Sequence, residues 1–194
     1  MRIMKLSKED KAYLNSFKHN TDNSNVRFKE IVKKVLLENK YLLHVIHNVQ
    51  LEDSGAEMDE YYNTSILPYF LIAATQHNVA NFLCYDVGFH YTSRDNQLVR
   101  QIEVTFYILC HQDDIIEKET GIARHDLIAA LILDEFDWSN HFGFQIHCVS
   151  DLPTVTDNNY MTRTLIFRGE YLTSIVKNRN GRPKVINSEV KQIG

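Results

Sequence analysis

The sequence predicts an α+β fold, in which an antiparallel four-stranded sheet of two hairpins is flanked by helices. Two kinds of spacing support this fold class. Apolar residues recur every three or four positions in residues 26–46, the clearest amphipathic helix, and again in residues 124–137. They alternate with polar residues in residues 83–91 and 98–110, as in strands that bury one face. The polar stretch 93–96 between these two strands indicates the first hairpin.

Weaker signals place the other N-terminal elements. Ser7 and Asp10 have the spacing of a capping box and precede apolar residues at helical spacing, so a short helix is expected there. Residues 48–65 are acidic and lack periodicity, which indicates a loop. Pro68 interrupts the apolar segment 66–74, which is therefore expected to be extended or irregular and buried.

The second hairpin is expected near the C-terminus. Its first strand begins at residues 144–148, and residues 151–159 carry a turn signature of proline, threonine, aspartate and asparagine. Its second strand covers residues 160–168, is interrupted by Gly169, and continues over residues 171–176 after a bulge.

These elements divide the chain into three parts. Residues 1–65 form an N-terminal helical extension with an acidic linker, and residues 66–178 form the α+β core. Residues 179–194 are polar and contain a turn signal, so they are predicted to be a flexible basic arm.

The net charge of −4 conceals a strong asymmetry along the chain. Residues 1–50 carry a net charge of +5, residues 51–161 carry −14, and residues 162–194 carry +5. An acidic middle argues against a broad face that binds nucleic acid, while basic ends suit contacts with an acidic partner.

Cysteine content and hydropathy indicate a protein of a cytosol-like compartment with no membrane partner. The three cysteines, Cys84, Cys110 and Cys148, cannot complete a disulfide framework and are expected to be buried thiols. No apolar run approaches the ~20 residues that span a bilayer.

The usual catalytic and metal-binding motifs are missing from the sequence. Nine histidines occur without zinc-ligand spacing, and there is neither a nucleophile elbow nor a glycine-rich phosphate loop. His44 and His47 are interpreted as surface or interface residues, and Asp113 and Asp114 as a solvated turn. No catalytic residue, metal or cofactor is therefore predicted.

One enzymatic alternative rests on two carboxylates. Asp86 and Glu103 on successive strands are arranged as in metal-dependent nucleases of the restriction-endonuclease fold. That chemistry needs a lysine two residues after the glutamate, where this chain has Thr105.

Two structural roles are assigned to basic residues. Arg163 shares a strand face with apolar residues, and a buried guanidinium needs a carboxylate, so we expect a pair with Asp157, with Asp151 as the more distant candidate. The second role is a possible assembly arm in the C-terminal segment, formed by Arg179, Arg182 and Lys184.

Several stretches resemble the tail-terminator and tail-completion proteins of tailed bacteriophages. They are residues 121–132 (GIARHDLIAALI), 138–143 (WSNHFG), 149–151 (VSD) and 156–167 (TDNNYMTRTLIF). The resemblance covers about residues 79–178. It implies an antiparallel sheet flanked by helices, no catalytic residues, and a ring of six or twelve copies between the capsid portal and the tail.

The leading hypothesis is thus a structural virion protein of the head–tail neck, assembled in the host cytoplasm. It would contact portal, neck and tail proteins and let double-stranded DNA pass without sequence-specific binding. The N-terminal and C-terminal extensions lie outside the part that the family core needs. They either act as clasps between rings or indicate that the protein forms a different neck ring, such as a connector. The alternatives are a metal-dependent nuclease and a cytosolic adaptor that binds one protein.

Overall fold

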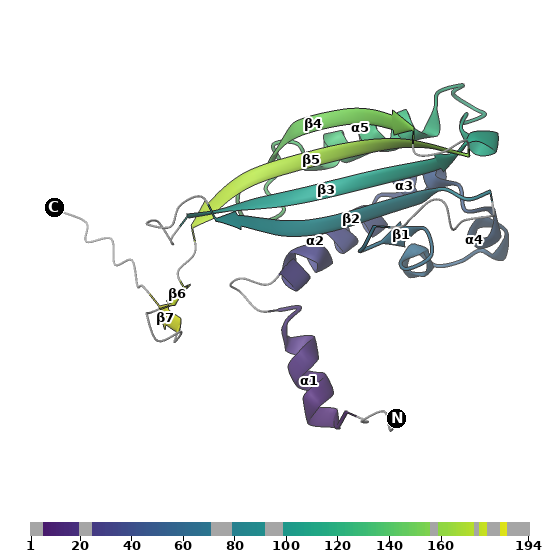
Figure 1. Ribbon diagram of the computed structural model, residues 1–194. Helices are drawn as coiled ribbons and strands as arrows, with labels where there is room; N and C mark the ends of the chain where they lie inside the picture. The colour runs from purple at the N-terminus through teal and green to yellow at the C-terminus, as the bar shows by residue number, and fades with distance from the viewer. Residues whose placement is uncertain are drawn as a thin grey trace.

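One sheet with helices packed on one of its faces organises the protein. The computed structural model in Figure 1 describes residues 6–19, 25–70, 79–91, 99–155, 159–172, 175–177 and 183–185. The helices are α1 (Lys8–Ser16), α2 (Asn25–Glu38), α3 (Lys40–Ile46), α4 (Val49–Ser54) and α5 (Arg124–Phe136), with 3-10 turns η1 (Met58–Tyr61) and η3 (Gln112–Asp114). The strands are β1 (Ile66–Leu67), β2 (Phe82–Tyr91), β3 (Val99–His111), β4 (His147–Val155), β5 (Tyr160–Leu172), β6 (Ile175–Lys177) and β7 (Pro183–Val185).

The sheet is mixed and five-stranded, so the prediction of a four-stranded antiparallel sheet was wrong. Its order is β1-β2-β3-β5-β4, and β1 pairs with β2 in parallel, with Ile66 opposite Leu83. β1 has only two residues and is followed by Pro68, so alternation cannot reveal it in the sequence. The two predicted hairpins, β2–β3 and β4–β5, are confirmed, and β3 and β5 join them at the centre.

The main core lies between the sheet and the helices α2, α3 and α5. Alternate residues of β3, among them Val104, Phe106 and Ile108, point to this side and are fully buried. The ring of Phe106 lies 5.0 Å from that of Phe136 on α5 and 5.7 Å from that of Phe167 on β5. The opposite face carries a smaller cluster of four buried residues, Leu67, Cys84, Leu109 and Tyr160.

β5 passes Gly169 without the predicted bulge. Ladder pairing with β3 continues through Gly169, and the register shift lies instead in β4, between Cys148 and Ser150. A Cβ atom at position 169 would lie 2.6 Å from the backbone oxygen of Gln145 and 2.7 Å from Cγ2 of Ile146. Glycine is therefore needed there because the chain before β4 packs directly on β5.

Gly169→Ala is expected to lower the free energy of unfolding by about 1–3 kcal/mol, because the added methyl group overlaps backbone atoms that cannot yield freely. Gly88→Ala on β2 is the matched control, since a Cβ atom there meets nothing within 4 Å. It should change stability by less than ~0.5 kcal/mol. Equal urea midpoints for the two variants would contradict the close approach at Gly169.

Asparagine caps explain where the helix predictions differ from the structure. The expected helix over residues 26–46 is two helices, because Asn39 is extended and its side chain accepts a hydrogen bond from Leu42 N at 3.0 Å. Asn48 caps α4 in the same way, inside a segment predicted to be a loop. The capping box of Ser7 and Asp10 at the start of α1 is confirmed.

β4 is longer than predicted and forms one edge of the sheet. It continues through Pro153 to Val155, where a turn had been expected. An edge strand tolerates Pro153 because its outer side needs no ladder hydrogen bond. Within the predicted C-terminal arm, β7 pairs with β6 as a short antiparallel ribbon.

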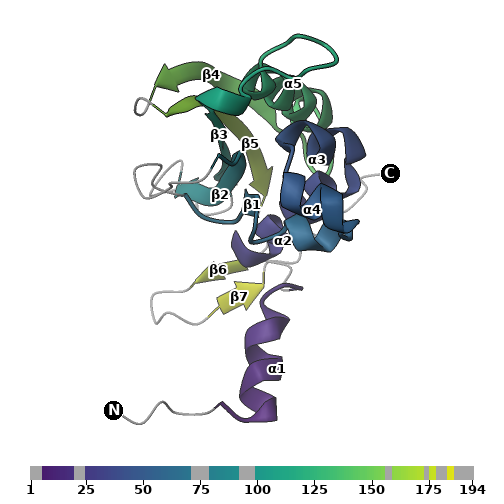
Figure 2. The same ribbon diagram turned by 90° about the vertical axis from the view of Figure 1, so that its right-hand side faces the viewer.

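Figure 2 shows α1 extending away from the sheet, on the side opposite β4. None of its residues is buried. The two ends of the described fold, β4 and α1, are thus separated by the width of the sheet (Figures 1 and 2).

Candidate functional site

Arg163 is held by two carboxylates that come from different elements. Its Nε and Nη2 donate to the two oxygens of Asp151 on β4, at 2.6 and 2.8 Å, and Nη1 donates to Asp126 in the first turn of α5. Asp157, its predicted partner, lies outside the described residues. The arginine therefore ties β5 to β4 and to α5, across the side of the sheet that faces the helices.

Arg163→Met is expected to lower the free energy of unfolding by about 1–2 kcal/mol, because it leaves two carboxylates facing each other without a cation. Arg163→Lys should fall between wild type and Arg163→Met, since it keeps the charge but loses the bidentate geometry. Chemical denaturation measures both variants. Wild-type stability of the methionine variant would show that this cluster does not stabilise the fold.

Most of the predicted assembly arm lies outside the residues that the structure describes. Arg179 and Arg182 lie outside the described residues, and Lys184 lies in β7. The role proposed for these three residues stays a prediction.

The two carboxylates of the nuclease alternative are each engaged by a cation. Asp86 pairs with Lys29 of α2 at 2.6 Å, and Glu103 pairs with Arg168 of β5 at 2.8 Å. Among the residues that the structure describes, no group of three histidine, cysteine, aspartate or glutamate side chains is arranged to hold a metal ion. Asp86 therefore links β2 to α2, and Glu103 links β3 to β5.

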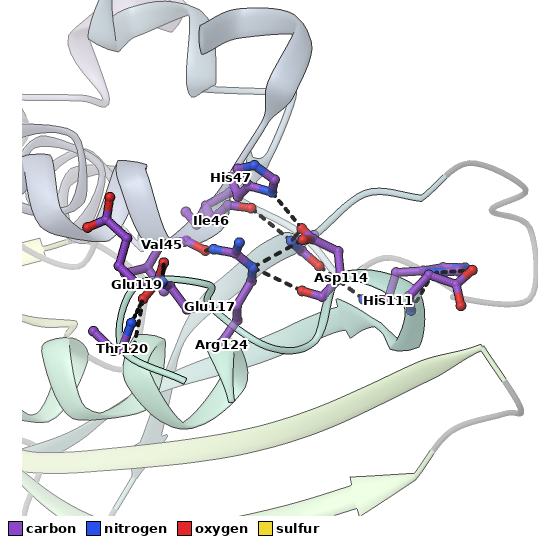
Figure 3. A network of polar contacts seen from close by, with 11 residues as sticks. Val45, Ile46, His47, His111, Asp114, Glu117, Glu119, Thr120 and Arg124 are labelled. Atoms are coloured by element: carbon purple, nitrogen blue, oxygen red, sulfur yellow. Dashed lines mark hydrogen bonds and ion pairs between the residues drawn. The ribbon is translucent and has the colours of Figure 1, made fainter. Parts of the chain in front are cut away.

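A polar junction centred on Asp114 joins four elements (Figure 3). Oδ2 of Asp114 accepts hydrogen bonds from Nδ1 of His47, at the end of α3, and from Nδ2 of Asn81, just before β2, both at 2.8 Å. Because a carboxylate can only accept, the proton of this His47 contact sits on Nδ1. The Asp114 side chain is 15% exposed and that of its neighbour Asp113 is 69% exposed, so only Asp113 behaves as a solvated turn residue.

Arg124 closes the junction from the first residue of α5. Its side chain is 3% exposed, and Nε donates to the backbone oxygen of Asp114 at 2.9 Å while Nη1 donates to that of Val45 at 3.1 Å. Asn81 is fully used as well, because it also donates to the backbone oxygen of Ile46 and accepts from the backbone N–H of His111. The junction thus fixes the ends of α3, β2, β3 and α5 relative to one another.

A catalytic interpretation of His47 needs a hydroxyl or thiol hydrogen-bonded to the imidazole, and in the described part of the chain the hydrogen bond of the His47 side chain goes to Asp114. His47 and Asp114 resemble the base and orienting carboxylate of a hydrolase, and both line a groove of about 480 Å³. The buried hydroxyl of Ser65 in the same groove already accepts a hydrogen bond from Asn48 at 2.8 Å. The arrangement supports a role in holding the fold rather than in acyl transfer.

Glu117 organises the loop that leads from the junction into α5. Its carboxylate accepts the backbone N–H groups of Glu119 and Thr120, at 3.0 and 2.7 Å, and the hydroxyl of Thr120. The hydrogen bond from Glu119 is the main cause that lowers the pKa of Glu117 to about 2.

The low pKa of Glu117 predicts an acid-dependent part of the stability. The folded pKa lies below the unfolded value near 4.3, so the contribution is fully present above about pH 5 and is lost as the pH falls towards 2. Glu117→Gln should therefore be less stable than wild type at pH 7, with a gap that narrows between pH 5 and pH 2. Urea midpoints measured across this pH range give the difference in stability between the variant and wild type. Glu119, on the same loop, is exposed, so the midpoint of Glu119→Gln should change with pH as that of wild type does. A gap that does not depend on pH would contradict this role.

Two of the three cysteines are buried, as the sequence predicts, and the third is only partly buried. Cys84 and Cys110 are buried, and Cys148 in β4 is half-buried. Burial raises the pKa of Cys110 and of Cys148, so both favour the protonated thiol over the reactive thiolate.

A set of exposed apolar residues follows the edge strand β4. Trp138, Val149 and Leu152 are 65%, 43% and 62% exposed, and we call them the β4-edge surface. Trp138 stacks on His147, the first residue of β4, with ring centroids 5.5 Å apart. Its φ of +57° is uncommon for a bulky residue and is held by a hydrogen bond from its N–H to the backbone oxygen of Ile146. The sequence does not reveal this exposure, because Trp138 directly follows the apolar pattern of residues 124–137.

A second exposed apolar surface lies on α1. Tyr13 is 66% and Leu14 53% exposed, and both lie on the side of the helix that carries Phe17. No helix of the described residues is both long and apolar enough to cross a membrane.

Fold and site together define a class of protein: a single-sheet α+β protein with a buried polar junction and large apolar side chains exposed on two sides. The chain belongs to the YomW family, whose model matches residues 39–168. YomW is the name of a Bacillus prophage protein, which indicates a phage origin. The matched region runs from the cap of α3 into β5, so α1 and the C-terminal ribbon lie outside it. No curated protein matches the chain.

Proposed function

We propose that this protein is a structural component of a tailed-bacteriophage particle that forms a ring in the neck between head and tail. It would be a tail terminator, a tail-completion protein or a connector ring, with six or twelve copies. The phage origin of its family and the resemblance of residues 121–167 to tail-terminator proteins both support this function.

The observation that carries the proposal is the pair of unlike apolar surfaces on opposite sides of the sheet. The β4-edge surface with Trp138 lies at one edge, and α1 with Tyr13 lies beyond the other (Figures 1 and 2). Exposed aromatic residues of this size are typical of protein interfaces. A contact between two unlike patches on successive copies is heterologous, and such contacts close into rings when the rotation between copies allows it.

Charge marks one side of the proposed contact. Residues 124–155, which span α5 and β4, carry five acidic residues and one arginine. On α1, Lys8 and Lys11 balance Glu9 and Asp10, so the lysines of one copy can meet these carboxylates in the next copy without a large like-charge penalty.

The acidic centre of the chain suits a channel for DNA. Residues 51–161 carry −14, and phosphates near unpaired carboxylates are repelled. A ring lined by this part of the protein would let double-stranded DNA pass without binding its sequence.

The mass of the assembled species tests the proposal. The protein is co-expressed with the portal-side and tail-side proteins of its prophage and measured by native mass spectrometry and negative-stain microscopy. We expect a closed ring of six or twelve copies, alone or on these neighbours. A strict monomer in every mixture would contradict the proposal and favour the adaptor.

The adaptor is kept as a second candidate because a groove runs between α2, α3 and α5. It has a volume of about 690 Å³ and could hold a segment of another protein. The nuclease has less support, since Asp86 and Glu103 are occupied by Lys29 and Arg168. Calorimetry with Mg²⁺ and Mn²⁺ separates these classes, because only the nuclease requires specific binding of a divalent metal.

A further inference from the structure

α1 is a well-capped helix that buries nothing in its own chain. The hydroxyl of Ser7 accepts the N–H of Asp10 at 3.1 Å, and the carboxylate of Asp10 accepts the N–H of Ser7 at 2.9 Å. Yet the helix has nine residues and none is buried. Isolated helices of this length are marginal in water, so the helix needs a surface that covers its apolar side.

The apolar side of α1 has a distinct charge on each of its edges. Tyr13 and Leu14 are four and three residues before Phe17, so the three lie on one side of the helix, on whose first turn Asp10 forms the cap. Lys11 and Lys18 are three and four residues from Leu14 and line its edge. Glu9 is four residues before Tyr13 and lines the other edge.

The groove between α2, α3 and α5 has the complementary arrangement. Its apolar lining comes from Ile31, Val35 and Leu131. The α5 wall carries Asp134 and Glu135. The wall formed by α2 and the start of α3 carries Lys34 and Lys40, with Glu38 paired to Lys34 at 3.7 Å.

The groove and the β4-edge surface are close to each other along the chain. His141, three residues after Trp138, lines the groove and contacts Glu135 at 3.1 Å. The groove and the β4-edge surface therefore flank the same loop, which follows α5.

We infer that α1 of one copy docks in this groove of the next copy, as an exchanged arm that links successive subunits of the ring. The inference rests on the proposed function. Lys11 would face Asp134 and Glu135, and Glu9 would face Lys34 and Lys40. In its own chain α1 points away from the helices, beyond the Lys18–Glu30 ion pair of 3.6 Å, so docking in its own groove would require the helix to reverse (Figure 2).

A disulfide mixing experiment tests which groove α1 occupies. Lys11→Cys and Asp134→Cys are placed in separate full-length chains that also carry Cys148→Ser, and the chains are mixed and oxidised. Both positions are exposed, so neither change disturbs the core. We expect a covalent dimer of the two chains. Glu9→Cys, on the other edge of α1, is the matched control and should cross-link at least about fivefold more slowly.

Charge reversal gives a second readout that does not depend on cysteines. Lys11→Glu should weaken assembly about fivefold to tenfold, and Asp134→Lys in the same chain should restore it. Rings that form without the Lys11–Asp134 cross-link and ignore the charge reversal would overturn this inference and leave the proposed function standing. A chain that carries both Lys11→Cys and Asp134→Cys, and that cross-links only within itself while the separate chains do not cross-link, would overturn it in favour of docking in the same chain. Chains that stay monomeric on all their neighbours would overturn both.

Discussion

Asp114→Ala is expected to lower the free energy of unfolding by about 3 kcal/mol or more. The substitution removes the acceptor of His47 and Asn81 and leaves the Arg124 guanidinium, whose side chain is 3% exposed, without its carboxylate neighbour. A buried cation and buried donors without partners cost far more than the pair itself contributes. Equilibrium denaturation in urea, followed by tryptophan fluorescence and circular dichroism, measures the loss.

Asp113→Ala is the matched control for this prediction. It removes the same chemical group one residue earlier, where the side chain is 69% exposed. Its effect should stay within about 0.5 kcal/mol. Similar losses for the two variants would mean that the η3 turn, rather than the polar junction, stabilises this end of the sheet.

Trp138→Ala is expected to weaken assembly about 30-fold or more while leaving the isolated subunit folded. Trp138 is 65% exposed and contacts His147 by stacking, so the subunit loses little packing. Exposed tryptophans at interface centres often contribute ~2 kcal/mol or more to binding, which corresponds to this factor. Sedimentation velocity over a range of concentrations gives the dissociation constant.

Tyr69→Ala serves as the control for Trp138. Tyr69 is another aromatic residue that is 50% exposed, but it follows β1 at the other side of the sheet. It should leave both assembly and stability near wild type. If Trp138→Ala assembles like Tyr69→Ala, the β4-edge surface is not part of the interface.

Local patterns predict the parts of the fold whose sequence shows strong periodicity. β2, β3 and α5 were expected close to their observed bounds, because each has a long apolar pattern of one period. The break at Asn39 was missed because the apolar spacing continues across it, although an asparagine that caps the next turn ends the first helix. β1 was missed because two residues carry no period.

Among the polar contacts, too, only partners close in sequence could be predicted. Arg163 was expected to need a carboxylate, and Asp151 was one of two candidates near it in sequence. Asp126 lies 37 residues away and could be matched only by the packing of α5 on β5. Asp114 was interpreted as solvated because its partners, His47 and Asn81, are 67 and 33 residues distant.

The exposed surfaces could not be predicted from composition. Tyr13 and Trp138 belong to apolar patterns that normally face a core, and only the tertiary structure shows that they face outwards. Charge along the sequence was no more informative, because α3 of the basic N-terminal part packs on the acidic α5.

Cryo-electron microscopy of particles released from the induced prophage tests the central claim most directly. We expect density for this protein as a closed ring of six or twelve copies at the head–tail junction, with α1 reaching from each copy to the next. Complete particles whose necks and tails lack this protein would contradict the account.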